Sequence, residues 1–479
     1  MTAAVETPAR PKLSRNYWRL WTGSVFSNLG DGIGFIAHAW LASAVTRDPV
    51  LISLIAVASR LPWLVFTLPA GVITDRVDRR KLMVAMDVVR AGLVFAVAFT
   101  VLAAQSGLPS PAEVAAGVSV STDLGLYTLL LVVVLLMGMA EVLRDNSAQT
   151  FLPSIVKPEN LERANGTLWG AEMVMNSFVG PPIGSLLLGI GFALPFFLNA
   201  GGFALAAGLV FLISGEFRSS GRTEAQNGVK VDWKGEVREG FAWLWRHPVL
   251  RSMAIILGIL NALGMMTFST FILFAQENLD METGLFTGVL RPVASAFGAD
   301  SVAAFIFSVM MMAGAIGGVL GSILAPRVAA KMGRGPALYM TIVVGGASSA
   351  VIGATDRWWT VFLMFLMGMF TGVVWNVITV SFRQTIIPDA LLGRVNSVYR
   401  FFGWGMMPIG SILGGLVVAA FTPLVGRSDA LRWPFFVAAA IHAVLLVYAV
   451  PRLSSARLAA AREAAELREV VDQAGESHG

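Results

Sequence analysis

The sequence predicts an all-α polytopic membrane protein with twelve transmembrane helices in two related halves of six helices. Hydrophobic residues make up 56% of its 479 residues and charged residues only 14%, and the mean hydropathy is +0.71. A soluble domain carries about 25% charged residues. A helix that crosses the hydrocarbon core needs roughly 20 apolar residues, and helices satisfy their own backbone where no water is present. Twelve apolar segments are long enough, at 17–46, 50–73, 82–104, 124–148, 163–189, 193–214, 250–275, 301–325, 336–355, 358–382, 394–420 and 431–451.

An internal repeat divides these segments into two halves. QTFLP at 149–153 recurs as QTIIP at 384–388, and PPIGSLLLG at 181–189 recurs as MPIGSILGG at 407–415. Two parallel six-helix halves are one of the internal symmetries of transporters, with the substrate bound near mid-membrane between them. The expected segments are a tail at 1–16, a first half at 17–214, a linker at 215–249, a second half at 250–451 and a tail at 452–479.

The polar linker contains one amphipathic stretch. Its apolar stripe consists of Trp233, Val237, Phe241, Leu244 and Trp245. Residues at this spacing share one face of a helix, with charged residues on the other faces. The linker is therefore expected to form a helix that lies in the membrane interface.

The basic residues predict the orientation of the chain. Most Lys and Arg lie on the side that holds both termini and the loop at 71–81, and the other side holds Arg47, Arg291, Arg357, Arg427 and Arg432. Cytoplasmic loops carry the excess of basic residues, so both termini are predicted to be cytoplasmic in a multi-pass protein of the inner (plasma) membrane. The preference for Arg over Lys favours a bacterial source. The net charge of +5 reflects this bias and predicts no nucleic-acid binding.

Ionisable side chains within a membrane segment are costly and are therefore candidates for function. Asp31 and His38 share one face of the first segment, and Arg60 lies in the second. At 1.5 Å per helical residue, Asp31 and Arg60 both lie about 20 Å from the cytoplasmic surface, so they are expected to meet. Such a pair suits a carboxyl that gains and loses a proton during transport. It also suits a static pair that joins two helices, and His38 suits either a neutral hydrogen-bonding role or proton transfer.

A second group of charges lies nearer the cytoplasmic ends of the third, fourth and fifth segments. It consists of Asp87, Arg90, Glu141, Arg144, Asp145 and Glu172. We expect these residues to form, with the loop at 71–81, a network that holds the cytoplasmic gate shut. Glu141 and Glu172 are also candidate proton or cation sites, with a plain salt-bridge role as the alternative.

The second half differs because it has no Asp, Glu, Lys or Arg deep within a segment. It offers polar amides and aromatic rings instead, among them Asn261, Trp375, Asn376, Phe401 and Trp404. A mostly apolar wall with a few polar groups suits a bulky amphiphilic ligand. Proton handling is therefore expected in the first half and substrate contact in the second.

The loop GVITDRVDRRK at 71–81 carries a family pattern. The pattern residues are Gly71, Asp75, Arg76, Asp78, Arg79 and Arg80. They resemble the loop between helices 2 and 3 of major facilitator superfamily transporters, with Asp78 where that family has Gly. RLPW at 60–63 and LERANG at 161–166 extend the resemblance toward the enterobactin-exporter-like and macrolide-efflux-like branch. The resemblance implies the major facilitator fold.

The same resemblance implies contacts for the loop. Asp75 should meet the start of the eleventh helix. Arg79 or Arg80 should meet an acidic group at the end of the fourth helix, either Asp145 or Glu141. These contacts would stabilise the closed cytoplasmic gate.

The fifth segment carries a second motif, formed by Asn176, Gly180, Pro181, Pro182 and Gly184. It resembles the helix 5 motif of exporters that exchange drug for proton, although Asn176 and Ser185 replace glycines of the family pattern. Glycine permits close contact between helices, and proline removes a backbone donor and bends the helix. The motif therefore favours export.

The sequence thus predicts a proton-coupled exporter of an amphiphilic small molecule such as an antibiotic, siderophore or secondary metabolite. The expected partners are the substrate, protons and the lipid bilayer, with a monomeric chain and no cofactor. ATP is not the energy source, because no G-x-x-x-x-G-K-[ST] motif occurs. The sequence contains no cluster of metal-ligating residues and no nucleophile–base set, so it does not predict an enzyme. The alternatives are an uptake symporter or facilitator of the same fold, and a membrane sensor or scaffold that does not transport.

Overall fold

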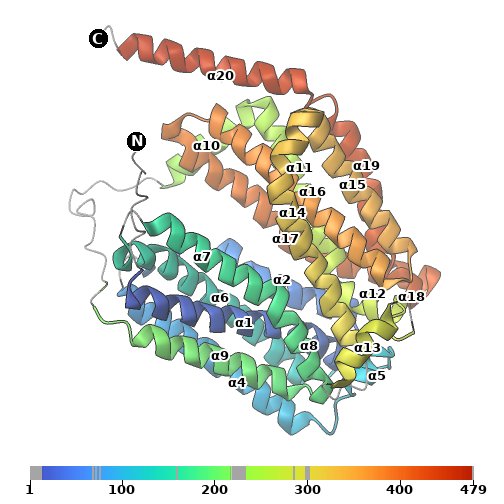
Figure 1. The fold of residues 1–479 in the computed structure, drawn as a ribbon. Helices are drawn as coiled ribbons and strands as arrows, with labels where there is room; N and C mark the ends of the chain where they lie inside the picture. Colours follow the sequence, from blue (N-terminus) through green and yellow to red (C-terminus); the bar gives the residue numbers. More distant parts are fainter. Residues whose placement is uncertain are drawn as a thin grey trace, which may run out of the picture.

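The computed structural model describes residues 13–66, 69–70, 73–74, 77–157, 160–215, 217, 233–283, 286–296 and 302–476. Within these residues the regular structure is entirely helical (Figure 1). The helices form two groups that correspond to the two sequence halves. We call the side of the molecule on which α1 begins the terminal face, and the side on which it ends the distal face.

The first half contains six membrane-crossing rods. They are α1 (Arg15–Val45), α2 (Pro49–Val65), α4 (Arg79–Ala104), α6 (Leu124–Ile155), the continuous rod of α7 (Leu161–Met173), η2 (Val174–Val179) and α8 (Gly180–Ile190), and α9 (Ala193–Phe211). The short helix α5 (Pro111–Ala115) lies on the distal face. Its capping box joins Ser110 and Glu113.

The second half contains the other six. They are α11 (Pro248–Ser269) with α12 (Phe271–Asn278), α14 (Ala303–Met332), α15 (Arg334–Ala354), α16 (Trp358–Ile386), α17 (Asp389–Val425) and α19 (Trp433–Ala449). The short helices α13 (Thr287–Ala296) and α18 (Arg427–Ala430) lie on the distal face, and α10 (Trp233–Arg246) and α20 (Ser455–Glu476) on the terminal face.

Among the residues that the structure describes, ten helices are long and apolar enough to cross a membrane. The two remaining rods, α1 and α2, complete the expected twelve: α1 has 31 residues with a more polar sequence, and α2 is apolar with 17 residues. Several helices run past the apolar segments that predict them. For example, α14 continues to Met332 and α16 to Ile386. Hydropathy marks only the part of a helix that lies in hydrocarbon, whereas backbone hydrogen bonding continues into the interface.

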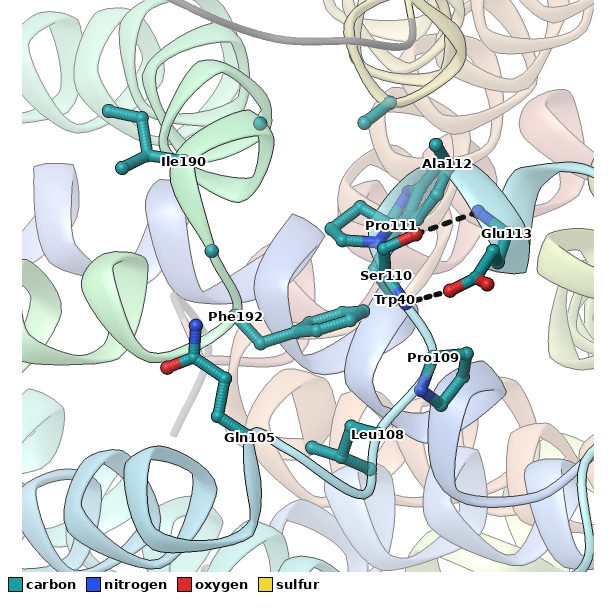
Figure 2. Close-up of a pocket in the computed structure, with 13 residues that line it drawn as sticks. Trp40, Gln105, Leu108, Pro109, Ser110, Pro111, Ala112, Glu113, Ile190 and Phe192 are labelled. Atoms are coloured by element: carbon teal, nitrogen blue, oxygen red, sulfur yellow. Dashed lines mark hydrogen bonds between the residues drawn. The ribbon is translucent and has the colours of Figure 1, made fainter.

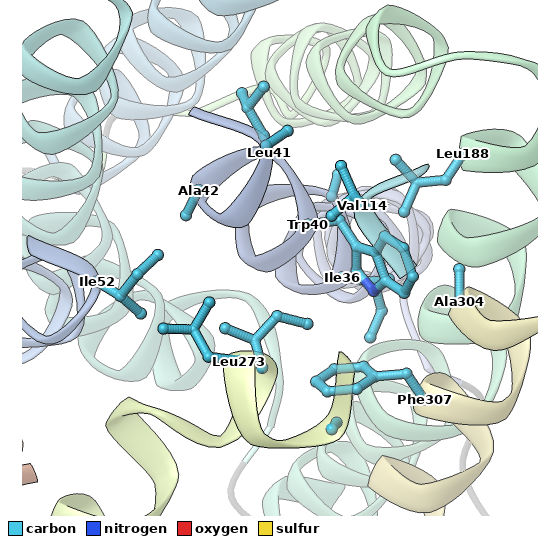
Figure 3. Packing of buried hydrophobic residues seen from close by; sticks show 14 of the residues in the cluster. Ile36, Trp40, Leu41, Ala42, Ile52, Val114, Leu188, Leu273, Ala304 and Phe307 are labelled. Carbon is cyan, nitrogen blue, oxygen red and sulfur yellow. The ribbon is translucent and has the colours of Figure 1, made fainter. Parts of the chain in front are cut away.

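The halves share one hydrophobic core near the distal face and have separate cores toward the terminal face. In the shared core, Ile36 and Trp40 of α1 pack near Leu273 and Phe307 of the second half (Figure 3). A second core consists of residues of the second half and its linker helix, and a small third one, including Tyr17 and Phe151, lies within the first half. The two groups of helices accordingly diverge toward the terminal face (Figure 1).

The linker helix α10 packs against the second half. Leu244 is fully buried, while Phe241 and Trp245 stack on Phe402 of α17 with ring centroids 6.3 Å apart in both pairs. The predicted stripe residues Trp233 and Val237 have side chains outside the described part of the structure. Phe241 and Trp245 of the predicted stripe therefore cover α17 at Phe402.

Candidate functional site

A chain of alternating acidic and basic side chains crosses the first half. Arg90 Nη2 lies 2.5 Å from Asp31 Oδ1, and Arg90 Nη1 lies 3.6 Å from Asp87 Oδ1. Arg144 Nε lies 3.4 Å from Asp87 Oδ1, and Arg144 Nη1 lies 3.5 Å from Asp145 Oδ1. The five residues come from α1, α4 and α6. We call this set the central charge chain.

Arg90 is the centre of this chain. It is 1% exposed, donates a hydrogen bond to Ser27 Oγ at 3.2 Å and lies 3.9 Å over the ring of Phe203. Asp87 is fully buried, whereas the Asp31 side chain keeps 26% of its surface. A buried guanidinium held by two carboxylates and a hydroxyl fixes the relative positions of α1 and α4. Of the two acids that pair with Arg90, Asp31 is therefore the accessible one.

The predicted partner of Asp31 was wrong, because the structure pairs Asp31 with Arg90 rather than with Arg60. Arg60 is exposed on α2, which packs mainly against α6 and α17 and hardly against α1. Counting residues places Asp31 and Arg60 at similar depths, but depth does not determine the direction in which a helix points a side chain. The structure thus joins Asp31 to the acidic and basic residues that the sequence places nearer the terminal face.

Three further predicted residues surround the chain. Glu141 interacts electrostatically with Asp31, Arg90, Asp145 and Arg60, so Arg60 does belong to the same neighbourhood. Glu172 is exposed and interacts with Asp145, Arg144 and Asp31. His38 hydrogen-bonds through Nδ1 to the Gly34 carbonyl at 2.7 Å and packs edge-on against Phe196, and its buried Nε2 has no hydrogen-bond partner among the described residues.

The family loop is described only in part. Gly71, Asp75 and Arg76 lie outside the described residues, so their expected contacts are not seen. Asp78 is the N-cap of α4 and accepts hydrogen bonds from the backbone N–H groups of Lys81 at 2.9 Å and Phe217 at 3.1 Å. This capping role gives a physical reason for an Asp at a position where the family has Gly.

Two basic residues follow Asp78 at the start of α4. Arg79 is the first residue of the helix, and Arg80 donates to the Ile213 carbonyl at 2.5 Å. The resemblance led us to expect Arg79 or Arg80 on Asp145 or Glu141. In the structure Asp145 pairs with Arg144 on the same helix, and Arg80 binds the end of α9 instead.

The helix 5 motif forms a close crossing of α1 and the α7–η2–α8 rod. A Cβ atom added at Gly180 would lie 2.7 Å from Gly32 Cα, and one at Gly184 would lie 2.7 Å from the Ile33 carbonyl oxygen. The π-helical turn η2, which contains Asn176, directly precedes Pro181 and Pro182. Proline lacks the backbone donor that would continue the regular pattern, so a π-turn at this point has a local cause.

The motif also contacts the second half. Ser185 lies one turn beyond the prolines, and its Oγ is 3.3 Å from Ser308 Oγ on α14, with both residues buried. Ser185 replaces a glycine of the family pattern. The departure therefore adds a polar contact between the halves.

The predicted substrate wall is only partly on an accessible surface. Phe401 is 64% exposed, and Trp404 is 41% exposed with its ring 5.9 Å from Trp63 of the first half. Asn261 donates to the Gly403 carbonyl at 2.8 Å and so supports the same stretch of α17. Asn376 is exposed and donates to its own helix at the Gly372 carbonyl. Phe401 and Trp404 thus offer accessible aromatic surface on α17.

The structure shows that Trp375 is not part of the predicted substrate wall. It is only 2% exposed and belongs to the core of the second half, so it cannot line an accessible cavity. A tryptophan pattern alone does not distinguish a core position from a cavity position. Sequence reasoning also missed Arg383, a buried arginine in the last turn of α16 that lies 3.7 Å over the ring of Tyr399.

A cavity of about 330 Å³ lies on the distal face, away from the charge chain (Figure 2). It is bordered by the loop that carries Ser110 and Glu113, by the turn at 189–192 and by Trp40. The capping-box hydrogen bonds between Ser110 and Glu113 hold the loop in place. This cavity does not coincide with the site that the sequence predicts.

Comparisons with known proteins bear on this arrangement. A family model described as Major Facilitator Superfamily matches residues 20–403. The chain is 26% identical over 434 residues to the multidrug efflux pump Tap of Mycolicibacterium fortuitum, covering 88% of this chain and 90% of that protein. It is 23% identical over 447 residues to Tap of Mycobacterium tuberculosis (strain ATCC 25618 / H37Rv), covering 91% of each.

Solved structures share the fold at low sequence identity. The nucleoside transporter NupG superposes with a TM-score of 0.63 and 14% identity, covering 92% of this chain and 99% of that chain. A bacterial homologue of the iron transporter ferroportin in an inward-facing state gives a TM-score of 0.61 and 16% identity, covering 92% of this chain and 100% of that chain. These matches support the twelve-helix architecture and carry no information about the substrate.

Proposed function

The chain belongs to the major facilitator superfamily, and from this membership we propose that it exports an amphiphilic small molecule in exchange for protons. The observation that carries the proposal is the asymmetry between the halves. The central charge chain lies in the first half, whereas the accessible α17 surface of the second half presents aromatic rings. One half is thus suited to proton handling and the other to an amphiphile.

The proton step follows from an excess of acids among the described residues. Five carboxyl groups interact with three basic groups, those of Arg60, Arg90 and Arg144; the acids are Asp31, Asp87, Glu141, Asp145 and Glu172. An unpaired carboxylate away from water is costly, and a bound proton or cation removes that cost. Asp31 is the preferred proton carrier, because it is accessible and directly bonded to Arg90. Its protonation would weaken that ion pair and allow Arg90 to turn toward the buried Asp87.

Two observations support export over uptake. The Gly180–Gly184 crossing resembles the exporter motif, and relatives across most of the chain are named multidrug efflux pumps. The direction would follow from coupling: protonation of Asp31 favours one orientation of the halves and bound substrate the other, so an inward proton gradient drives the substrate outward. Antibiotics, siderophores and secondary metabolites are the substrate classes that we propose.

The proposal includes a location and an assembly state. We place the protein in the bacterial inner membrane as a monomer, with the terminal face and both chain ends in the cytoplasm. The bias of basic residues toward the terminal face supports this orientation. A transporter of this kind needs no enzymatic centre, and its partners would be the substrate, protons and lipid.

The test is transport in inside-out membrane vesicles. A drug-sensitive bacterial strain that expresses the chain is first screened against a panel of amphiphilic antibiotics. A compound to which the expressed chain gives resistance is then added to vesicles whose interior has been acidified. We expect proton-driven accumulation in the parent chain and its loss in Asp31→Asn, because an asparagine amide cannot gain and release a proton.

Glu466→Gln is the matched control, because Glu466 forms an exposed ion pair with Arg462 in the C-terminal helix. It should leave accumulation unchanged. Accumulation driven by the opposite gradient would identify an uptake symporter, and entry that needs no gradient and stops at equal substrate concentrations would identify a facilitator. Resistance that is the same for the parent chain, Asp31→Asn and an empty vector would indicate a sensor or scaffold. Each of these results would overturn the proposal.

A further inference from the structure

A compact group of charged residues joins the two halves on the distal face. Arg47 follows the end of α1 in the first half, and Glu277 lies in the last turn of α12 in the second. Arg47 Nη2 lies 2.8 Å from Glu277 Oε1, and the two side chains are only 8% and 12% exposed. The pair is therefore a largely buried ion pair between elements that belong to different halves.

A second arginine completes the group. Arg427, the first residue of α18, holds the Glu277 carboxylate with two donors, Nε at 2.9 Å from Oε2 and Nη2 at 2.9 Å from Oε1. Its Nη2 group also donates to the backbone carbonyl of Arg47 at 2.6 Å. Arg427 thus orients Glu277 and touches the first half directly. We call Arg47, Glu277 and Arg427 the distal clasp.

Further hydrogen bonds extend the clasp along the same boundary. Arg47 Nη1 donates to Gln276 Oε1 at 2.6 Å, and Gln276 Nε2 donates to Ser43 Oγ at 3.0 Å. Deeper in, Ser53 Oγ donates to Ser269 Oγ at 3.4 Å. All three bonds connect the first half to the second, and they lie beside the shared hydrophobic core.

The geometry makes these contacts specific to one state of the protein. Rocking of the halves that opens the distal face must separate Arg47 from Glu277, since they lie on opposite sides of the boundary. An interaction made in only one of two states shifts the equilibrium between them by its full free energy. Removing one partner of such a mostly buried pair leaves the other charge buried and unpaired, so a single substitution destabilises the closed arrangement.

We propose that the distal clasp is the outer gate, and that breaking it is the step that opens the central site to the distal face. The proposal rests on the proposed alternating-access function. Arg47, Glu277 and Arg427 act as positioning residues, because they set the orientation of the halves and need not touch the substrate. Loss of the clasp favours the state that is open at the distal face.

The test measures a distance across the distal face. The chain has no cysteine, so spin labels can be attached to Ala116→Cys and Ala354→Cys in the full-length protein. Both alanines are exposed on the distal face in different halves: Ala116 directly follows α5, and Ala354 is the last residue of α15. Double electron–electron resonance in lipid nanodiscs then reports the ratio of short to long distances without any substrate.

We expect Glu277→Gln to raise the ratio of long to short distances roughly tenfold, which corresponds to a coupling of ordinary size between contacting residues. Arg47→Gln should do the same, and the charge-exchanged pair Arg47→Glu with Glu277→Arg should recover part of the parent ratio. The matched control is Glu282→Gln. Its exposed ion pair with Arg291, 3.2 Å long, lies on the same face but within the second half.

The outcomes separate this proposal from the transport proposal. If Glu277→Gln and Arg47→Gln leave the distances as in the parent while vesicles still transport, the clasp is not the gate. If the distances lengthen in these variants and no compound is transported, the gate stands and the transport proposal fails. An equal shift in Glu282→Gln would also overturn the gate, because it would show a general effect of charge on this face.

Discussion

Replacing Arg90 by methionine tests the central charge chain most directly. The substitution keeps an unbranched stem, which is shorter than that of arginine, and removes the guanidinium. Asp31 then loses its partner at 2.5 Å, and Asp87 loses one of its two arginines. The cation–π contact with Phe203 and the hydrogen bond to Ser27 are lost as well.

The expected cost is that of breaking a buried ion pair. Arg90 is 1% exposed, so water cannot replace its contacts, and removing one partner of such a pair costs about 3–5 kcal/mol. Unfolding entropy is about 2.1 cal/mol/K per residue, or roughly 1 kcal/mol/K for a chain of this length that unfolds cooperatively. Arg90→Met should therefore lower the Tm by about 3–5 °C.

The assay is thermal unfolding of purified protein in detergent, followed by circular dichroism. Adding Asp31→Asn to Arg90→Met should recover about 1–3 kcal/mol, because the double variant no longer holds an unpaired Asp31 carboxylate. Arg462→Met removes an exposed ion pair and should change the unfolding free energy by less than about 0.5 kcal/mol. A parent-like Tm for Arg90→Met, or no recovery in the double variant, would refute the described contacts.

Two further predictions concern the helix 5 crossing and the start of α4. Gly180→Ala places a methyl group 2.7 Å from backbone atoms and should cost about 1–3 kcal/mol, whereas Gly170→Ala faces open space and should be neutral or stabilising by up to about 1 kcal/mol; equal Tm values would contradict the close crossing. Asp78→Ala should cost about 1 kcal/mol through loss of the N-cap, and Asp78→Asn much less. Burial alone would raise the pKa of Asp78, but hydrogen bonds from the N–H groups of Lys81 and Phe217 and nearby positive charge hold the pKa below its usual value. This stabilisation is therefore complete above about pH 4 and is lost at lower pH, so the Tm difference between parent and Asp78→Ala should shrink on acidification.

Much of the fold was predictable because membrane insertion is a strong constraint. The apolar runs, the repeat between QTFLP and QTIIP and the family loop predict twelve helices in two halves, and the family match and the solved structures confirm that architecture. The Gly180–Gly184 motif also predicts a close helix contact, and the structure has one against α1. These features depend on local composition, which the sequence displays directly.

The partners of charged residues were harder to predict. Depth along a helix follows from counting residues, but the count put Glu141 nearer the cytoplasm than Asp31 and Arg60, whereas the structure places all three in one neighbourhood. Which arginine reaches Asp31 depends on the rotation and tilt of three helices. In the structure Arg90 of α4 contacts Asp31, and Arg60 of α2 does not pair with it. The burial of Trp375 and the cation–π contact of Arg383 depend on packing in the same way.

The sequence by itself determined that this chain crosses a membrane many times, in two repeated halves. It also determined that the ionisable groups deep within the membrane segments are concentrated in the first half. Insertion into hydrocarbon requires continuous apolar helices, so the pattern is written in the order of residues. Only the tertiary structure decided that Asp31 meets Arg90 and that Arg47, Glu277 and Arg427 meet across the boundary between the halves. Such contacts join residues 59, 230 and 150 positions apart, and their formation depends on how whole helices pack.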